Sequence, residues 1–478
     1  MKSLVLAEKP SVARDIARVL GCHKNISGAI EGSNYIVTWA LGHLVTLADP
    51  EEYDKKFKAW DMSYLPMVPK KWELVVIKQT SKQYHNVKTQ LFRKDVSEII
   101  IATDAGREGE LVARWILDKS GCHKPIRRLW ISSVTDKAIK EGFAHLKDGR
   151  AYNDLYHAAR SRAEADWLVG INATRALTCK YNAQLSCGRV QTPTLAMIAH
   201  REQQIRSFKP EDYYGLRCTT SVTSGSVGTM ASIVTWTWQQ KKSGSLRSFN
   251  KDLITGLDKK LKNQTLTVTD VHTSSKRTPS PGLYDLTELQ RDANKRFGFS
   301  AKETLNIMQS LYEHHKVLTY PRTDSRYIGT DIVPTIKERL KACNIGPYKK
   351  YIPELLKKPL KTSKAFVDDK KVSDHHAIIP TEEYVQMEHM SNNERKIYDL
   401  VVRRFISVLY PAFEYEQTTL KAEAAGETFT AKGKVIKAAG WKAVYADAAS
   451  SCSSASQYDA YGDYEDSEDF GEDFQNND

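Results

Sequence analysis

Apolar positions follow two different periods along the first 150 residues. Short continuous apolar runs predict buried strands at residues 3–7, 34–39, 98–103 and 129–132. Apolar residues spaced three and four apart predict helices at residues 10–20, 111–116 and 135–146. Pro10 suits the start of the first helix, and Gly21 suits its end. Alternating strands and helices predict an open, mostly parallel sheet, which binds ligands at the carboxyl ends of its strands.

The pattern changes beyond residue 150. Residues 151–207 are predicted to be helical, and they carry many arginines. Residues 212–275 favour strands, for example at 232–238 and 265–271. Two prolines within residues 274–282 indicate a linker between this part of the chain and the next.

Helices are predicted again over residues 283–415. Gly298 suits the end of one of them, and a capping box at residues 300–303 begins the next. Strands then return, with predicted positions at residues 417–422, 428–431 and 434–436. From residue 448 the chain is rich in Ser, Asp, Glu and Tyr, and we expect it to be disordered.

The run V-L-T-Y-P-R-T-D-S at residues 317–325 places a tyrosine where a predicted strand ends. Pro321 cannot continue the strand's hydrogen-bond ladder, so Tyr320 leaves the strand at a turn. A phenol two residues from the guanidinium of Arg322 suits attack on a phosphodiester and stabilisation of the charge that develops. The alternative is a core tyrosine followed by a surface arginine.

Carboxylates gather at two predicted strand ends. The turn D-A-G-R-E-G-E at residues 104–110 follows a buried strand and carries Asp104 and Glu108, while Glu8 and Lys9 follow the first strand. Neighbouring parallel strands would bring these ends together, and carboxylate oxygens are ligands for Mg²⁺. The alternative is a solvated acidic turn with local helix caps, but the pairing of two such strand ends favours the metal site.

Charge and composition narrow the class of protein. The net charge is +12, and residues 451–478 contain nine acidic and no basic residues, so residues 1–450 carry +21. Such a basic body favours nucleic acid as a partner, although a merely soluble basic protein remains possible on charge alone. The seven cysteines form no C-x-x-C pair, and no apolar run reaches the ~20 residues that span a membrane. We expect a cytoplasmic protein without a zinc site, disulfide framework or signal peptide.

Six segments, in this order and spacing, resemble type IA DNA topoisomerases, most closely the bacterial topoisomerase III branch. They are A-E-K-P-S at 7–11, residues 102–110, A-D-W-L-V-G-I-N at 165–172, S-C-G-R-V-Q-T-P-T at 186–194, residues 318–325 and H-H-A-I-I-P-T at 375–381. They are spread along residues 1–446, from residue 7 to residue 381, and six such segments in order make the resemblance specific.

The resemblance implies a multidomain α/β and α+β fold with a Toprim (Rossmann-like) domain, a toroidal frame and a winged-helix-like domain that carries the tyrosine. The expected limits are 1–150 for the Toprim domain, 151–211 for a helical DNA-binding segment, 212–280 and 416–447 for the two parts of a β-rich arch, 281–415 for the tyrosine domain and 448–478 for the acidic tail.

The resemblance also implies an activity: cleavage of single-stranded DNA by Tyr320 through a 5′-phosphotyrosyl bond, passage of another strand and resealing without ATP. Negative supercoils would be relaxed and linked DNA separated. The enzyme would act as a monomer at the bacterial nucleoid, on single-stranded or negatively supercoiled DNA, with a helicase or single-strand-binding protein as a possible partner.

Roles follow for the residues that match the family's motifs. Tyr320 would be the nucleophile, and Arg322 would stabilise the phosphoryl transition state. Glu8 would be a general acid, a Mg²⁺ ligand or both, and Lys9 would contact the scissile phosphate. His375 would lie near the cleavage site, although the adjacent histidine or a structural role is an alternative. The implied Mg²⁺ ligands are Glu8, Asp104 and Glu108.

The implied DNA contacts lie mainly in residues 151–211. They are Ser186, Cys187, Gly188, Arg189, Val190, Gln191, Asp166, Trp167, Arg175 and, from an earlier segment, Trp60. Gly188 would allow close backbone approach and Arg189 would meet a phosphate. Trp167 is equally compatible with a place in the core.

Two departures from the family pattern stand out. The usual acidic turn reads D-x-D-x-E, and Gly106 replaces its middle acid here, which predicts weaker magnesium binding and puts the metal role of Glu108 in doubt. After residue 446 the family normally continues with a returning strand and a closing helical segment. We therefore expect a C-terminally truncated or naturally short chain whose ring is open.

Two other functions compete with the topoisomerase interpretation. A single-stranded DNA-binding and cleaving fragment without strand passage would share every motif, and relaxation of a supercoiled plasmid would distinguish the two. A Toprim primase or nuclease is disfavoured, because neither needs the tyrosine motif.

Overall fold

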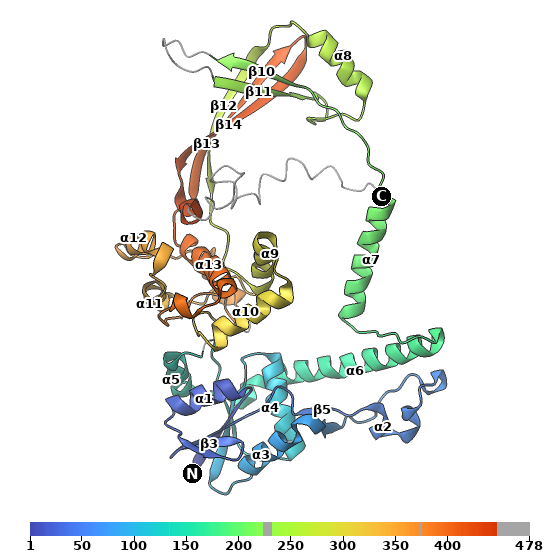
Figure 1. Ribbon diagram of the computed structural model, residues 1–478, viewed down its shortest axis with the longest axis vertical. Coiled ribbons are helices and arrows are strands. Elements are labelled where there is room, and N and C mark those ends of the chain that lie inside the picture. The colour runs from blue at the N-terminus through green and yellow to red at the C-terminus, as the bar shows by residue number, and fades with distance from the viewer. Residues whose placement is uncertain (133, 223–231, 373–374, 447–478) are drawn as a thin grey trace. The chain divides into compact units, whose positions relative to one another are not determined.

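The computed structural model describes residues 1–132, 134–222, 232–372 and 375–446 (Figure 1). The chain forms two compact units, each built from two stretches. Residues 1–200 and 282–406 form the first unit, and residues 201–281 with those from 407 onward form the second. The predicted disordered tail at 448–478 lies outside the described residues.

A mixed sheet forms the base of the first unit. Within the described residues it has seven strands in the order β2-β3-β4-β1-β7-β8-β9, and the central four, β4, β1, β7 and β8, run parallel. Their bounds are β1 Lys2–Ala7, β2 Lys24–Ile26, β3 Ala29–Glu31, β4 Tyr35–Trp39, β7 Val96–Ala102, β8 Ile126–Arg128 and β9 Lys147–Asp148. A separate hairpin pairs β5, Val45–Leu47, with β6, Leu74–Val76. The predicted mostly parallel sheet is thus confirmed for its four central strands, whereas β2, β3 and β9 pair antiparallel at its edges.

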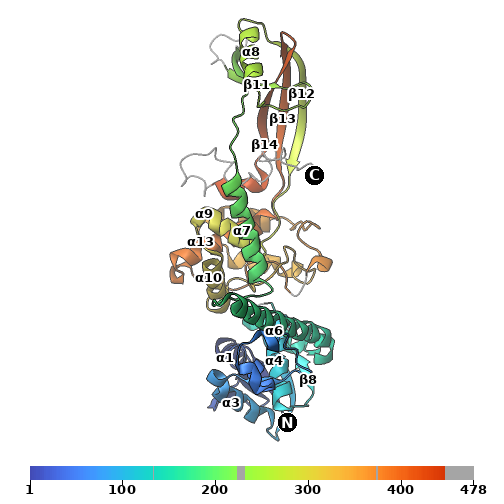
Figure 2. The same ribbon diagram turned by 90° about the vertical axis from the view of Figure 1, so that its right-hand side faces the viewer.

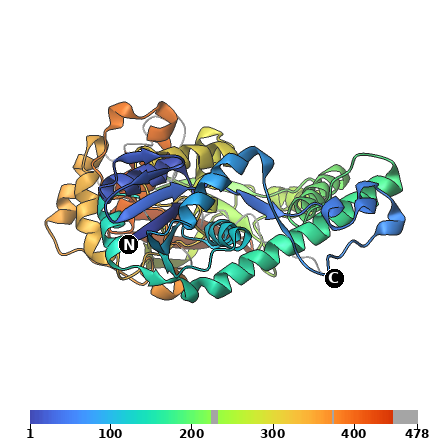
Figure 3. The same ribbon diagram turned by 90° about the horizontal axis from the view of Figure 1, so that it is seen from below.

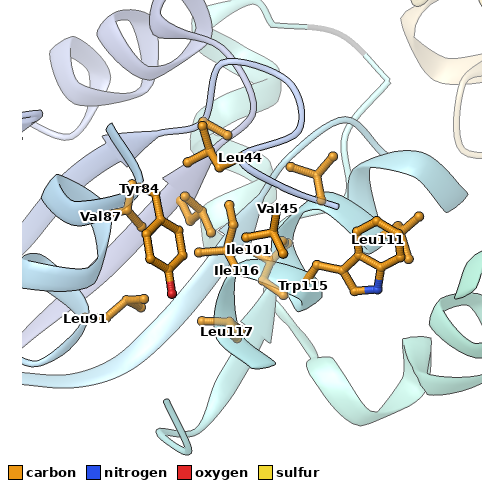
Figure 4. Packing of buried hydrophobic residues seen from close by; sticks show 14 of the residues in the cluster. Leu44, Val45, Tyr84, Val87, Leu91, Ile101, Leu111, Trp115, Ile116 and Leu117 are labelled. Atoms are coloured by element: carbon orange, nitrogen blue, oxygen red, sulfur yellow. The ribbon is translucent and has the colours of Figure 1, made fainter. Parts of the chain in front are cut away.

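Helices cover both faces of this sheet because the buried strands are apolar on both sides. Leu4 and Leu6 of β1 pack on the face covered by α3 and α4, while Val5 and Ala7 pack on the face covered by α1. Figure 4 shows side chains of the first cluster, such as Tyr84 of α3 and Trp115 of α4. The helix α6 runs beside α4 as one long element (Figures 2 and 3). The helices are α1 Pro10–Val19, α2 Pro50–Tyr53, α3 Ser81–Leu91, α4 Arg107–Ser120, α5 Asp136–Ala144, α6 Asn153–Tyr181 and α7 Gln191–Ser207.

One predicted strand of this sheet is wrong. The apolar run at residues 129–132 suggested a strand, but β8 ends at Arg128. Only Ile126–Arg128 pairs with β7, and the chain leaves the sheet just beyond that point. The run is apolar because it lies against other parts of the unit, and not because it is paired in the ladder.

The second stretch of the first unit is helical, as predicted. Its helices are α9 Leu286–Phe297, α10 Ala301–Glu313, α11 Ile336–Ala342, α12 Ile352–Leu356 and α13 Asn392–Ser407. Gly298 ends α9 in the left-handed conformation with φ of 72°, and the Ser300 side chain caps α10 by accepting from the Glu303 amide. The predicted strand before Tyr320 is wrong: Leu318 forms only an isolated bridge with Pro380.

The second unit is an antiparallel sheet with one covering helix, α8 Lys251–Leu261 (Figure 2). Within the described residues its five strands run in the order β10-β11-β14-β13-β12. They are β10 Arg217–Val222, β11 Ser232–Gln239, β12 Thr267–Thr278, β13 Phe413–Ala424 and β14 Glu427–Ala438.

Two predictions for this unit need correction. Residues 274–278 of the predicted linker belong to β12, where they pair with β13, and only the prolines that follow interrupt the strand. The predicted strands at 428–431 and 434–436 form a single strand, β14, because Gly433 keeps its pairing with Thr418.

A buried ion pair holds the turn between β7 and α4. Arg128 and Glu110 are fully buried, and the Arg128 Nε donates to Glu110 Oε2 at 3.0 Å. The same guanidinium donates to the carbonyls of Thr103, at 2.9 Å, and Asp104, at 2.8 Å. Burial of an ion pair is costly unless its remaining hydrogen-bonding capacity is satisfied, and here the strand-end carbonyls satisfy it.

Replacement of Glu110 by Gln should destabilise the first unit, because it leaves the Arg128 charge buried without its counter-ion. The expected loss is about 3 kcal/mol of unfolding free energy, measured by urea denaturation. Glu108→Gln is the matched control, since the Glu108 side chain is 57% exposed in the same turn, and it should change stability by about 0.5 kcal/mol or less. Equal effects of the two substitutions would contradict the structural role of the pair.

Candidate active site

Two adjacent parallel strands deliver the acidic residues of the site. Ala7 of β1 lies in register with Ala102 of β7, so the residues that follow each strand meet at one edge of the sheet. There Glu8 Oε2 accepts a hydrogen bond from the Asp104 amide at 3.1 Å. The sequence-predicted proximity of Glu8 and Asp104 is therefore what the structure shows.

The electrostatics of this edge favour protonation of its acids. Burial, followed by the neighbouring Asp104 charge, raises the pKa of Glu8 to about 7. Burial likewise raises the pKa of Asp104, although Lys9 acts in the opposite direction. Two buried carboxylates of like charge resist being ionised together unless a cation is near.

Lys9 joins this edge to the helical stretch of the unit. Its Nζ lies 2.5 Å from Glu313 Oε1 and 3.9 Å from Asp104 Oδ2. Glu313 is the last residue of α10, and it also accepts from Gln309 Nε2 at 2.5 Å. Sequence reasoning missed Glu313, since the only signal was an acid on a helix that ends seven residues before Tyr320.

Tyr320 lies at the same place, with its ring half-buried. The ring stands edge-on to Tyr312, with centroids 5.5 Å apart, and the Tyr320 amide donates to the Ser132 carbonyl at 3.1 Å. Burial and then the Asp104 charge raise the pKa of the phenol, and Arg322 opposes that rise. The hydroxyl is thus protonated at neutral pH and must lose its proton to become a nucleophile.

Arg322 lies beside the tyrosine with its side chain exposed. It forms no ion pair with another described residue, yet it is near enough to Asp104 and Tyr320 to act on the pKa of both. An exposed guanidinium at the mouth of an acidic site is suited to an incoming phosphate group.

His375 contacts the tyrosine ring directly. Their ring centroids lie 4.2 Å apart with an interplanar angle of 31°. Burial, and then the adjacent His376, lowers the pKa of His375 to about 4, so the imidazole is neutral at pH 7. Neither ring nitrogen makes a well-aligned hydrogen bond with the described residues, although the Ala105 backbone lies close enough to oppose part of the pKa shift.

His376 points elsewhere. Its Nδ1 lies 2.7 Å from the Ala377 carbonyl oxygen, and it borders a separate cavity together with Asp331 and Arg339. Of the two histidines, the structure places His375 against Tyr320.

The donors fit a hard divalent cation only in part. Glu8 and Asp104 supply adjacent carboxylates whose raised pKa values a bound cation would lower. Glu108 points away from them: its carboxylate lies 3.3 Å from Arg162 Nη1 and 3.8 Å from His43 Nε2. Among the described residues, no three His, Cys, Asp or Glu side chains form a ready metal cluster.

The predicted DNA-binding residues line a second part of the first unit. A cavity of about 530 Å³ lies between α6 and the 186–191 segment, and its lining includes Lys58, Trp60, Arg175 and Gln191. The Arg175 guanidinium lies 5.1 Å from the Trp60 ring centroid, and Trp60 is 51% exposed. An exposed aromatic ring against a cation is a platform on which a nucleic-acid base can stack.

The remaining predicted contacts have different surroundings. Arg189 Nε donates to Asp166 Oδ1 at 2.7 Å on an exposed surface. The backbone amides of Cys187 and Gly188 donate to the hydroxyls of Thr174 and Thr192, respectively. The structure also places Ser186 in the cavity lining and Val190 on the exposed surface. Trp167 lies in the core, where it donates to the Ala48 carbonyl at 2.9 Å and packs against Trp72, which favours its core interpretation.

None of the helices in the described parts of the chain is both long and apolar enough to cross a membrane.

The raised pKa of Glu8 predicts a pH-dependent loss of stability in the absence of divalent cations. The folded state retains a proton that an ordinary glutamate releases near pH 4.5, so stability falls as pH rises from there to about 7. Relative to wild type, Glu8→Gln should therefore gain roughly 1–3 kcal/mol over this interval in urea denaturation with EDTA. Excess Mg²⁺ should reduce the gain, and a difference that does not vary with pH would refute the assignment.

Comparison with known proteins identifies the family to which the chain belongs. The family model described as DNA topoisomerase matches residues 150–465, and the model described as Toprim domain matches residues 3–134. DNA topoisomerase 3 of Bacillus cereus is 64% identical over 444 residues, which are 93% of this chain and 59% of that protein. DNA topoisomerase 3 of Bacillus subtilis is 60% identical over 444 residues, which are 93% of this chain and 60% of that protein.

A solved structure shares the fold. Full-length topoisomerase I from Thermotoga maritima matches with a TM-score of 0.66 at 22% identity, covering 92% of this chain and 67% of that one. The chain spans 59–60% of the length of the two Bacillus relatives. The matching family models and the order of the elements lead to one conclusion: this chain belongs to the bacterial type IA DNA topoisomerase family.

Proposed function

We propose that this chain cleaves single-stranded DNA by transesterification to Tyr320, lets another strand pass and reseals the break without ATP. One observation carries the proposal: the Tyr320 phenol contacts His375 and lies within electrostatic reach of Glu8, Asp104, Glu313 and Arg322. A nucleophile among acids and cations from two distant stretches of chain is suited to attack on a phosphodiester.

The cleavage step exchanges one phosphoester for another. The Tyr320 Oη–P bond forms while the bond between phosphorus and the DNA 3′-oxygen breaks, which leaves a 5′-phosphotyrosyl bond and a 3′-hydroxyl. The phenol gives up its proton to solvent or to a neighbouring carboxylate, and the leaving oxygen gains one. Glu8 is suited to that donation while it holds no cation, because a pKa of about 7 leaves it partly protonated at neutral pH. Resealing reverses the same steps.

Cations stabilise the charge on the reacting phosphate. Arg322 is exposed beside the tyrosine, and Lys9 lies between Asp104 and Glu313. The neutral imidazole of His375 adds no charge, and it limits the space open to the phenol ring. We propose Mg²⁺ as the cofactor, held by Glu8 and Asp104; Glu108 would have to leave Arg162 and His43 before it could join them as a ligand. When bound, the ion would neutralise and orient phosphate oxygens.

The DNA strand is proposed to follow the surface that carries the cavity at α6. Trp60 and Arg175 offer a base-stacking platform, and Arg189 offers a phosphate contact once it leaves Asp166. Negatively supercoiled DNA, which exposes single strands, is the proposed substrate. The proposal places the protein in the cytoplasm at the nucleoid, with a helicase or single-strand-binding protein as the partner that supplies those strands.

The nucleophile is tested by Tyr320→Phe, which removes one oxygen. This variant should form no covalent adduct with a single-stranded oligonucleotide, since phenylalanine has no atom that can attack phosphorus, and it should bind the oligonucleotide as wild type does. Tyr312→Phe is the matched control, because it removes the hydroxyl of the adjacent ring and should leave the adduct intact. An adduct that survives in Tyr320→Phe on a denaturing gel would overturn the proposal.

The missing acid of the metal turn can be restored. Gly106 has an extended backbone with φ of −178°, and a Cβ there would meet no atom within 4 Å, so a side chain fits. Gly106→Asp should lower the Mg²⁺ concentration for half-maximal adduct formation by about tenfold, because it adds a charged oxygen ligand. Gly106→Asn adds the same volume without the charge and should produce little change. If Gly106→Asp and Gly106→Asn need the same Mg²⁺ concentration for half-maximal adduct formation, the proposal that Mg²⁺ binds at this turn is wrong.

A further inference from the structure

Trp130 lies where β8 ends and the chain leaves the sheet, half-buried on the same edge as Glu8 and Asp104. Its indole stacks on Tyr152, with ring centroids 4.8 Å apart and an interplanar angle of 22°. The Arg128 guanidinium lies 5.0 Å from the indole centroid. The indole is thus supported by an aromatic ring and a buried cation.

That support is rigid because Arg128 is fixed on every side. The guanidinium is fully buried, pairs with Glu110 and donates to the carbonyls at the end of β7. A side chain packed against this guanidinium is held in one position, since well-packed neighbours leave few alternative rotamers. Trp130 therefore presents a fixed ring plane to whatever lies beyond it.

The ring beyond it is His375. The planes of the Trp130 and His375 rings differ by 14°, and their centroids lie 6.4 Å apart. The same imidazole also contacts the Tyr320 ring, with centroids 4.2 Å apart. The imidazole thus connects the indole to the phenol in one series of rings. The Ala105 backbone is the polar group that interacts with the imidazole, but it forms no well-aligned hydrogen bond with either ring nitrogen. The contacts with Trp130 and Tyr320 therefore contribute to the orientation of the imidazole.

We propose that Trp130 is a positioning residue for the transesterification: it orients the His375 imidazole, and the imidazole in turn orients the Tyr320 phenol for attack. This inference rests on the proposed function of Tyr320 as nucleophile. The chain Glu110–Arg128–Trp130–His375–Tyr320 connects the buried ion pair of the sheet to the reacting hydroxyl. A displacement of about 1 Å at the reacting group can cost about 10²-fold in rate.

The test is a double-mutant cycle on single-turnover adduct formation at saturating oligonucleotide. Trp130→Ala should slow cleavage by at least about tenfold with an unchanged dissociation constant for DNA. Trp130→Phe keeps a stacking ring and should restore the rate to within about threefold of wild type. In a His375→Ala background, Trp130→Ala should have no further effect, because its action passes through the imidazole. The proposal is overturned if Trp130→Ala cleaves at the wild-type rate. It is also overturned if Trp130→Ala slows the His375→Ala variant as much as it slows the wild-type protein.

A control distinguishes positioning from general loss of packing. Phe143→Ala removes a half-buried ring in the same domain, where it packs edge-on against Tyr35 at 5.7 Å. It should lower the melting temperature as much as Trp130→Ala does and leave the cleavage rate near wild type. If Phe143→Ala slows cleavage as much as Trp130→Ala, the effect is general and the positioning role is wrong.

A measurement without DNA separates this inference from the proposed function. In NMR spectra with labelled histidine, the ring protons of His375, assigned by their absence in His375→Ala, should move when Trp130 becomes Ala and stay near the wild-type position when it becomes Phe. Unmoved signals contradict the stacking. If the His375 signals move in Trp130→Ala but the wild-type protein forms no adduct, the proposed cleavage is overturned. If the wild-type protein forms the adduct but the His375 signals do not move in Trp130→Ala, only the role of Trp130 is overturned.

Discussion

The buried pair between Arg128 and Glu110 is the constraint on which the site depends. A guanidinium with no exposure is tolerated only because Glu110 neutralises it and the carbonyls at the end of β7 accept its protons. Those carbonyls belong to the turn that carries Asp104, so the pair fixes the backbone from which the acid projects. The same guanidinium supports Trp130 on its other side. One ion pair therefore sets both the acidic edge and the aromatic contact with the tyrosine.

The balance between burial and charge explains the chemistry available there. Burial alone would leave Glu8, Asp104 and Tyr320 protonated, and it is the first cause of the raised pKa of each. Lys9 and Arg322 oppose that effect without removing it. Such a site holds an acid that can donate a proton near neutral pH. A cation that approaches the site, alone or with a substrate, would stabilise the ionised forms of its acids.

The sequence was sufficient for the parts of the site that follow from strand ends. Glu8 and Asp104 could be paired in advance because two apolar runs end at them and adjacent parallel strands align such ends. The sequence was insufficient to predict contacts between side chains that only the folded chain brings together. Glu108 and Glu110 alternate in one turn, and only the position of Arg128 decides which of them is buried. Trp130 lies in an apolar run that resembled a strand, and Glu313 approaches Lys9 across 304 residues of sequence, a contact that no periodicity reveals. The catalytic, metal-binding and DNA-binding roles of all these residues, Tyr320 included, stay predictions.

The most direct measurement is the chemical identity of the covalent link. The complex formed with a single-stranded oligonucleotide, labelled at its 5′ end in one sample and its 3′ end in another, can be digested with trypsin and analysed by mass spectrometry. The account predicts that the peptide containing Tyr320 carries the 3′-labelled fragment through its 5′-phosphate, while the 5′-labelled fragment is released with a free 3′-hydroxyl. A label on any other residue, or attachment of the 5′-labelled fragment, would contradict it.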